Sequence, residues 1–437
     1  MKSTNILIEE ITAGSHDPLF SELYGAVNDV SRQRKRYADL LKRHSTLLGE
    51  STESIKSAES APGIYSIPGR TELGGNHTDH NRGSVLAAGI NLDTLAAAVP
   101  SDDMIVVLDS EGFDPVTVDL SNLDLNTSHN RAGSTESLVR GIAAAFAADG
   151  YAIGGFKANT TTDVRKGSGL SSSAAIEITI AVLFNDLYNN NRVDAVSMAK
   201  YSQFAENVYF GKPCGLMDQT ACAYGGIVGI DFKDPKAPEI TEVSYSFHDK
   251  GYTLAVVDTG GNHADLTPAY AAITIEMGQI AEFFNASHCR DISLEMLIPA
   301  IPELRIKLGD RAVLRAYHFL KETLRAKEMT EALQNDDIDS YLSLAAASGN
   351  SSFKYLQNVY PSFNTNEQGL SLALAMTENF LKGDGACRVH GGGFAGTIQA
   401  FIPNNLVTRY KELMQGIFGN DAVEILAIRQ KPAGRVI

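Results

Sequence analysis

The stretch Gly167-Ser168-Gly169-Leu170-Ser171-Ser172-Ser173-Ala174-Ala175 is a loop rich in glycine and hydroxyl groups. A strand-like segment at 155–163 precedes it, and residues 176–188 have the apolar spacing of a buried helix. Glycines allow close approach to a polyanion, and a helix N-terminus offers unpaired N–H groups and the positive end of its dipole. The stretch therefore suits a phosphate group. The competing interpretation is a serine that caps the helix after a flexible turn.

Two further features bear on a phosphate site. Lys166 stands directly before the loop, where its charge can reach phosphate oxygens, and a serine hydroxyl can ligate a magnesium ion. The loop is not a Walker A motif, because the Gly-Lys-Ser/Thr ending is absent.

Composition limits the class of protein. The chain has 437 residues, 44% of them hydrophobic and 20% charged, which predicts a globular protein of two or three domains. Its net charge of −15 argues against nucleic acid as a partner. The cysteines lack metal-ligand spacing, and we expect no signal peptide or transmembrane helix. We therefore expect a cytoplasmic protein with reduced thiols and no membrane partner.

Strands and helices mix without a regular βα repeat, which predicts an α+β fold. Residues 51–61 form a polar linker, and 233–238 is the best candidate boundary between two lobes. We expect helices at 18–48, 134–148, 171–188, 194–210, 215–223, 266–286, 311–326, 338–348, 368–382 and from 404 onward. We expect strands at 85–90, 94–99, 104–108, 116–120, 226–231, 252–258 and 394–402.

The segment Pro68–Asn81 is dense in polar groups, and its proline, glycines and asparagines predict a loop. Asp79 can accept several hydrogen bonds and His77 can donate or accept, as recognition of a hydroxyl-rich ligand requires. The alternative is a polar turn whose Asp and Asn side chains cap a helix.

Two acids and a glycine run complete the candidate chemistry. Asp218, in a stretch bounded by Gly and Pro, can act as a general base or orient a hydroxyl nucleophile. Glu206 can supply a carboxylate for magnesium, although either acid can instead be an ordinary surface or helix-end group. Gly391–Gly393 suits close approach to a ligand or a tight turn between lobes.

In this order the segments resemble the GHMP kinases, and within them the galactokinases, from about Pro62 to the C-terminus. The family motifs are Pro-Gly-Arg…Glu-His-Thr-Asp-Tyr-Asn, Gly-x-Gly-Leu-Ser-Ser-Ser-Ala, Cys-Gly-x-Met-Asp-Gln and a glycine-rich run. Their counterparts here lie at 68–81, 167–174, 214–219 and 391–396.

The resemblance implies a two-lobed α+β GHMP kinase fold with an S5-like N-terminal lobe and a ferredoxin-like C-terminal lobe. ATP and substrate would lie between the lobes. The corresponding division is a helical extension at 1–54, an N-terminal lobe with the phosphate loop and sugar site at 55–235, and a C-terminal lobe at 236–437.

The resemblance also implies roles for single residues. Asp218 would take the proton from the anomeric hydroxyl of a sugar or orient that hydroxyl, and Arg70 would hold Asp218 ionised. Ser173 and Glu206 would ligate Mg²⁺. The sugar-facing residues would be Asn76, His77, Asp79, Gly215 and Tyr270. The ATP phosphates would lie against Gly167, Ser168, Gly169, Leu170, Ser171, Ser172 and Ser173.

Some positions depart from the family pattern. Asn76 replaces a glutamate that faces the hydroxymethyl end of the hexose, and His80, Arg82 and His390 also differ. A neutral amide would not repel a carboxylate at C6, which raises galacturonate or another modified galactose as a substrate. The same amide can still bond a C6 hydroxyl, as in a galactose enzyme.

The resemblance thus implies an ATP-dependent sugar 1-kinase, with galactose as the first candidate substrate. The alternatives are kinases for C6-modified or N-acetylated galactose-like sugars, a catalytically silent sugar sensor, and a kinase for an alcohol such as mevalonate or homoserine. The intact serine-rich loop with Arg70, Glu206 and Asp218 argues against the sensor. The stretch His77-Thr78-Asp79 argues against a non-sugar alcohol.

Overall fold

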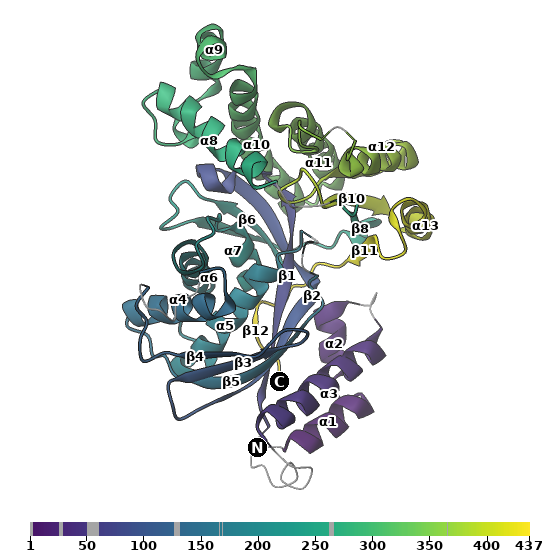
Figure 1. Ribbon diagram of the computed structural model, residues 1–437. Helices are drawn as coiled ribbons and strands as arrows, with labels where there is room; N and C mark the ends of the chain where they lie inside the picture. Colours follow the sequence, from purple (N-terminus) through teal and green to yellow (C-terminus); the bar gives the residue numbers. More distant parts are fainter. Residues whose placement is uncertain are drawn as a thin grey trace.

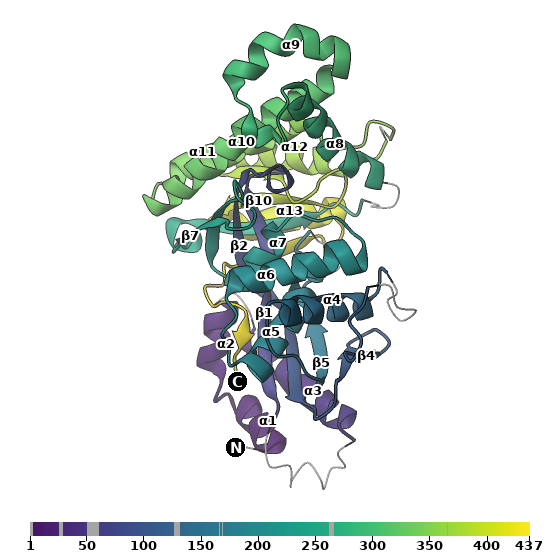
Figure 2. The same cartoon turned by 90° about the vertical axis from the view of Figure 1, so that its left-hand side faces the viewer.

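Within the residues that it describes, the computed structural model contains two β-sheets, with helices packed around them (Figure 1). It describes residues 3–25, 29–49, 61–125, 132–165, 167, 169–261, 266–364 and 366–437. Figure 2 shows helices α8–α12 gathered at one end of the molecule and α1–α3 near the other, close to the C-terminus. The mixed α+β architecture predicted from the sequence is confirmed.

The first sheet is built on the long antiparallel pair β1 (Gly63–Gly74) and β2 (Ser84–Pro100). The order β12-β1-β2-β5-β3-β4 runs across one end of this pair, and β6 and β7 extend from the other end of β2. The remaining strands of this sheet are β3 (Ile105–Ser110), β4 (Val116–Asp119), β5 (Phe156–Thr162), β6 (Ile227–Asp231), β7 (Glu239–Val243) and β12 (Gly434–Arg435).

The second sheet is antiparallel in the order β11-β8-β10-β9. Side chains from one face pack on α12 and α13, and those from the other face pack on α10 and α11, which also touch β1 and β2. Its strands are β8 (Tyr252–Asp258), β9 (Ala386–Val389), β10 (Thr397–Pro403) and β11 (Val423–Leu426).

The helices fall into three groups (Figure 1). The first group is α1 (Thr4–Ala13), α2 (Asp17–Tyr24) and α3 (Val30–Leu47). The second is α4 (Thr135–Ala148), α5 (Ser172–Asn189), α6 (Ala195–Phe204), continued by the π-helical turn η2 (Ala205–Phe210), and α7 (Met217–Tyr224). The third is α8 (Thr267–Phe283), α9 (Leu294–Leu308), α10 (Asp310–Gln334), α11 (Ile338–Ser351) with the π-helical turn η5 (Ser352–Leu356), α12 (Gly369–Leu381) and α13 (Val407–Phe418). Short 3₁₀ turns are η1 (Asp79–Asn81), η3 (His248–Lys250), η4 (Cys289–Asp291) and η6 (Asn404–Leu406).

Helices cover both faces of β2, and side chains that point to one face alternate along the strand with those that point to the other. Leu95 and Ala97 pack against the N-terminal helices, whereas Ala96 and Ala98 pack in the cluster formed with α4, α5 and α6. Successive side chains of a strand point to opposite faces, so a strand covered on both sides reads as a continuous apolar run. The N-terminal helices therefore form part of the main core.

Several sequence expectations are corrected. The expected helix at 18–48 is two helices, because α2 ends at Gly25, where φ is 72°. The strands expected at 85–90 and 94–99 are one strand, β2. Residues 68–74 belong to β1 rather than to a loop, because pairing with β2 outweighs the local turn preference of Pro68 and Gly69.

The C-terminal half also differs from expectation. Helix α9 was missed; it contains Pro299 and Pro302, which disfavour a helix when considered locally. The expected division after residue 235 does not separate the sheets, because β7 follows it and pairs with β6. Strand β12 returns to pair with β1.

Across the part of the chain that the structure describes, no helix has both the length and the apolar character needed to cross a membrane.

A buried charged cluster joins the N-terminal helices to β2. Asp93 on β2 is fully buried and binds Arg36 Nη1 of α3 at 2.5 Å and Tyr24 Oη of α2 at 2.8 Å. Arg429, also fully buried, lies 3.5 Å from the same carboxylate. The cluster therefore ties three distant segments together.

We predict that Asp93→Asn lowers the free energy of unfolding by about 3–5 kcal/mol, because it removes the anion beside the buried Arg429 and one of the two carboxylates that pair with Arg36. Chemical denaturation monitored by circular dichroism measures this change. The control is Asp39→Asn, which breaks only the solvent-exposed pairs with Lys35 and Lys42 and should change the stability little. Equal effects of the two substitutions would contradict the role given to Asp93.

Candidate active site

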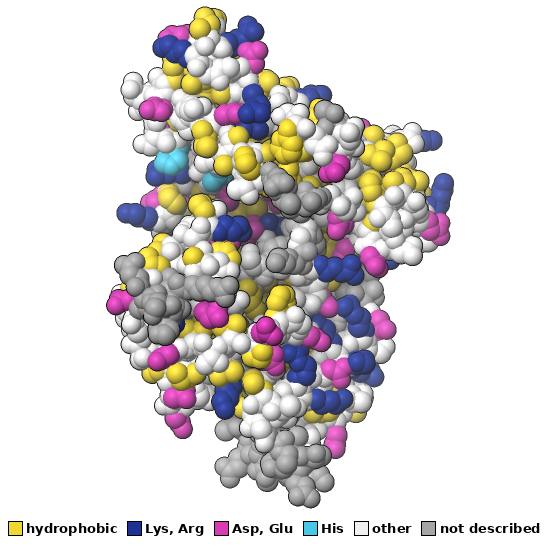
Figure 3. Space-filling model, viewed as in Figure 1, with side chains coloured by type: hydrophobic (Ala, Val, Ile, Leu, Met, Phe, Trp, Pro, Cys, Tyr) yellow, Lys and Arg dark blue, Asp and Glu magenta, His cyan; other side chains and the backbone are white. Residues whose placement is uncertain are grey.

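A cavity of about 190 Å³ lies where β1, the loop after it, the N-termini of α5 and α7, and the glycine run 391–393 meet. Figure 3 shows histidine side chains at the upper margin of a hollow between the upper and lower halves of the molecule. The cavity is lined by Arg70, Glu72, His77, Asp79, Ser173, Ala174, Glu206, Lys212, Cys214, Gly215, Met217, Asp218, Gln219, Gly391 and Gly392.

Arg70 and Asp218 form a two-point ion pair in the wall of this cavity. Arg70 Nε and Nη2 each donate to one oxygen of Asp218, both at 2.8 Å. Arg70 is buried on β1, whereas Asp218 lies in the first turn of α7 and is partly open to the cavity. Because the guanidinium fork matches a carboxylate, the pair fixes the orientation of Asp218.

The glycine- and serine-rich loop lies directly beside this pair. Gly167, Gly169 and Ser171 have positive φ angles of 83°, 70° and 63°, and α5 begins at Ser172. The Ser171 hydroxyl donates to Asp218 rather than capping the helix, and the loop is tied to β1 by the bond from Arg70 N to Leu170 O at 3.1 Å. Of the expected phosphate-binding residues, Ser173 lines the cavity.

The other residues expected to bind the phosphates either lie outside the described part of the chain or do not line the cavity. Ser168 and the preceding Lys166 lie outside the described residues. Gly167, Gly169, Leu170, Ser171 and Ser172 do not line the cavity itself.

A second group of polar side chains lies beside Ser173. Gln219 Nε2 donates to Glu206 at 3.0 Å and to Glu177 at 3.1 Å, and Lys212 Nζ binds Glu206 at 2.8 Å. Burial and the nearby Glu206 carboxylate raise the pKa of Glu177 to about 8. Oε1 of Glu177 is buried and has no hydrogen-bond partner among the described residues. The two carboxyl groups and the Ser173 hydroxyl form an oxygen-rich corner suited to a hard cation.

His77 and Asp79, in the loop between β1 and β2, also line the cavity. His77 Nε2 donates to the carbonyl oxygen of Gly392 at 2.8 Å, and burial lowers the pKa of this imidazole to about 3, so the ring is neutral. Asp79 accepts a bond from His80 Nδ1 at 3.1 Å. A Cβ atom at Gly215 would lie 1.7 Å from Asp79 Oδ2, so only glycine fits there.

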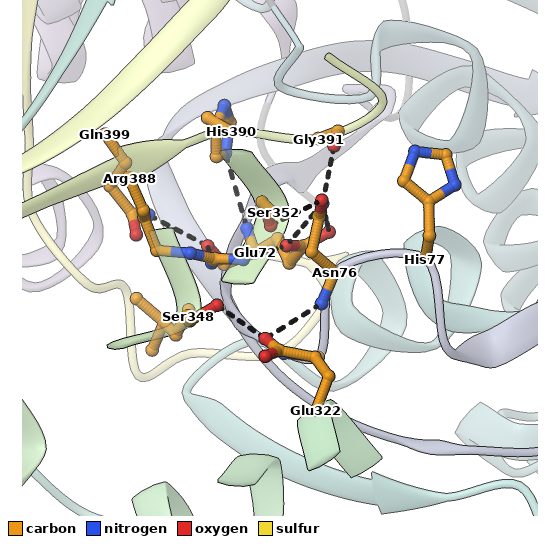
Figure 4. Close-up of polar contacts among 12 residues, drawn as sticks. Glu72, Asn76, His77, Glu322, Ser348, Ser352, Arg388, His390, Gly391 and Gln399 are labelled. Atoms are coloured by element: carbon orange, nitrogen blue, oxygen red, sulfur yellow. Dashed lines mark hydrogen bonds and ion pairs between the residues drawn. The ribbon is translucent and has the colours of Figure 1, made fainter. Parts of the chain in front are cut away.

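Asn76, which was expected to face the sugar, does not line the cavity. Asn76 is fully buried, and its Nδ2 donates to Gly391 O at 2.7 Å and to Glu72 Oε1 at 3.1 Å (Figure 4). Its Oδ1 accepts from Asn358 Nδ2 at 2.8 Å and from Ser352 Oγ at 3.2 Å. Every polar atom of the side chain is thus engaged by protein groups, and two of these residues, Glu72 and Gly391, themselves line the cavity.

Tyr270 was also expected to face the sugar, but it lies behind the glycine run. Its hydroxyl donates to Gly393 O at 2.8 Å, and a Cβ atom at Gly392 would lie 2.7 Å from the tyrosine ring. Tyr270 therefore supports the glycines that line the cavity without lining it.

Comparisons with known proteins agree with this arrangement. The model described as GHMP kinases N terminal domain matches residues 137–226, and the galactokinase galactose-binding signature matches residues 53–100. These two matches include the serine-rich loop, Asp218, Arg70, His77 and Asp79. The chain belongs to the GHMP kinase family.

Solved structures support the fold of this GHMP kinase. Lactococcus lactis galactokinase, crystallised with galactose, is 21% identical, with a TM-score of 0.74 over 90% of this chain and 98% of that one. Methanococcus jannaschii mevalonate kinase is 15% identical, with a TM-score of 0.57 over 85% and 99%. A D-glycero-D-manno-heptose 1-phosphate kinase from Bacteriodes thetaiotaomicron is 16% identical, with a TM-score of 0.58 over 85% and 97%. The predicted GHMP kinase fold is confirmed, and the enzyme is a phosphotransferase of galactokinase-like type.

Sequence reasoning missed other residues of this GHMP kinase cavity, notably Glu72, Lys212 and Gln219, together with Glu177 beside it. Two of them carried a usable signal. Glu177 stands four residues after Ser173 in a helix, and Glu72 stands two residues after Arg70 in a strand, so each pair shares a face. The shared face of Arg70 and Glu72 was not recognised from the sequence, because residues 68–74 were expected to form a loop rather than a strand.

The raised pKa of Glu177 has a consequence for stability. Between pH 4.5 and about 8 the folded GHMP kinase holds a proton that the unfolded chain releases, so stability falls as the pH rises through this window. We predict that Glu177→Gln, which cannot titrate, loses less stability than the parent over this range.

Thermal unfolding without divalent metal, from about pH 5 to about pH 8.5, tests this prediction. Glu303→Gln, an exposed substitution on α9, should follow the parent. A Glu177→Gln curve that also follows the parent would contradict the assignment.

Proposed function

We propose that this GHMP kinase transfers the γ-phosphoryl group of ATP to the anomeric hydroxyl of galactose. The observation that carries the proposal is the ion pair of Asp218 and Arg70, which lies between the serine-rich loop and the cavity wall bearing His77 and Asp79. The galactokinase galactose-binding signature at 53–100 supports galactose as the sugar.

Binding places the sugar between Asp218 and the loop after β1. Asp79 accepts hydrogen bonds from sugar hydroxyls, and the neutral His77 ring contributes a further polar contact. Gly215 leaves the space that the Asp79 carboxylate needs. These contacts hold the anomeric hydroxyl against Asp218, which lowers the entropic cost of the reaction.

In the chemical step Asp218 accepts the proton of the anomeric hydroxyl, and the freed oxygen attacks the γ-phosphorus. The bond from the γ-phosphorus to the β–γ bridging oxygen breaks, giving galactose 1-phosphate and ADP. Arg70 holds Asp218 in position and adds positive charge beside the transferred group. The backbone N–H groups of residues 169–173 and the N-terminus of α5 stabilise the phosphate charge.

The oxygen-rich corner formed by Ser173, Glu206 and Glu177 fits the Mg²⁺ that accompanies ATP in such reactions. We infer that the Ser173 hydroxyl and the Glu206 carboxylate hold the ion, with the unpartnered Glu177 Oε1 close by. When bound, Mg²⁺ neutralises charge on the phosphate oxygens.

We also infer a cytoplasmic location. Cys214, Cys222, Cys289 and Cys387 are free thiols, as expected in a reducing compartment.

The first prediction from this proposal concerns the substrate. With ATP and Mg²⁺, ADP release should be fastest with galactose, and slower with N-acetylgalactosamine, glucose and galacturonate. Chelation of Mg²⁺ should stop the reaction. A coupled assay of ADP release measures all four sugars in parallel. Preference for galacturonate would replace galactose as the substrate, whereas sugar binding without turnover would indicate a sensor.

The second prediction concerns Asp218. Asp218→Asn keeps the size of the side chain but removes the proton acceptor, so kcat should fall by a factor of about 10³ or more. Calorimetry should find galactose affinity within a few-fold of the parent. Asp102→Asn, in the exposed turn after β2, is the matched control and should keep full activity. Near-normal turnover of Asp218→Asn would remove Asp218 as the base.

A further inference from the structure

A buried carboxylate that no step above uses forms part of the cavity wall. Glu72 on β1 is 3% exposed and lines the cavity, next to the glycine run (Figure 4). Arg388 Nη2 on β9 donates to Glu72 Oε1 at 2.5 Å, and Arg388 Nη1 donates to the backbone oxygen of the same residue at 3.0 Å. The side chain is therefore held in one orientation.

The partners of Glu72 approach it from the protein side. Neither Arg388 nor Asn76 lines the cavity, and both are buried. Among the described residues, Oε2 of Glu72 has one contact, a long bond of 3.3 Å from Asn76 Nδ2. Because a carboxylate offers about four acceptor positions, Glu72 retains acceptor capacity toward the cavity.

Glu72 also lies at a definite distance from the reacting end of the cavity. Between Arg70 and Glu72, β1 pairs regularly with β2, from Gly89 to Ala87, so the two side chains share a face. Two residues of extended strand span about 7 Å. A pyranose whose anomeric hydroxyl meets Asp218, the partner of Arg70, thus turns its opposite end, with the C4 and C6 oxygens, toward Glu72.

We propose that Glu72 accepts hydrogen bonds from the hydroxyl groups at this far end of the sugar and makes the enzyme selective for a neutral hexose over a hexuronate. This inference rests on the proposed sugar kinase function. A carboxylate at C6 would lack the donor that Glu72 needs and would meet a like charge. Arg388 cannot offset this repulsion by direct contact, because it lies behind Glu72.

The neighbouring Asn76 fits the same account. Its Nδ2 must donate both to Gly391 O and to Glu72, which a carboxylate at position 76 could not do. An acid at position 76 would also lie against the Glu72 carboxylate. Asn76 is therefore a positioning residue. This chain has asparagine where the family has glutamate, and a carboxylate is supplied from position 72 instead.

The parent enzyme provides the first test, without any substitution. We expect kcat/KM to fall by about 10² or more, relative to galactose, for galacturonate and for at least one of 4-deoxygalactose and 6-deoxygalactose. No turnover of galactose would overturn the proposed function itself. Turnover of galactose with equal use of all three analogues would overturn only the role of Glu72.

The second test is Glu72→Gln, which keeps the shape and an acceptor for Arg388 but removes the charge. The KM for galactose should rise about tenfold with a smaller change in kcat, and the preference for galactose over galacturonate should fall about tenfold. A purely structural role would not move this ratio. Thr71→Ser, on the opposite face of β1, is the control and should keep the ratio. An unchanged ratio in Glu72→Gln would overturn the inference, and if that variant does not fold, the analogue series decides.

Discussion

The β1–β2 pair is the constraint on which the rest of this GHMP kinase depends. At one end its two faces are buried by the N-terminal helices and by the α4–α6 group, and at the other end by α10 and α11. The pair therefore belongs to both halves of the molecule. Arg70 and Glu72 lie on β1, and the connection to β2 carries His77 and Asp79, so packing of the hairpin also positions the site.

Buried polar groups hold this hairpin in place at three points along its length. Asp93 binds the N-terminal helices, Glu72 binds Arg388 of the second sheet, and Glu322 of α10 accepts the backbone N–H groups of Gly75 and Asn76. A buried charge that loses its partner is costly, so each cluster permits one arrangement of its segments. The result is a cavity whose acids and donors are oriented before substrate arrives, as transition-state stabilisation requires.

The sequence predicted those parts of the site whose structure is set by residues that are close together along the chain. The serine-rich loop and the start of α5 were predictable, because glycine, hydroxyl groups and an apolar helix follow one another along the chain. Asn76 and Tyr270 were expected to face the sugar but do not line the cavity. The direction of their side chains depends on partners more than 100 residues away, such as Asn358 and Gly393. Segment 68–74 was misread since Pro68 and Gly69 favour a turn, whereas β2 supplies hydrogen bonds along the whole strand.

The sequence by itself determined the α+β class, the order of the motifs and the residue types that the chemistry needs, because these follow from local propensity, periodicity and charge. Only the tertiary structure decided which carboxylate reaches the cavity. Glu72 lies in the wall and Asn76 behind it, since Arg388 and the carbonyl oxygen of Gly391 approach from elements distant in sequence. It also decided that the N-terminal helices belong to the core, because burial of the second face of β2 is a property of the packed sheet and not of any segment alone.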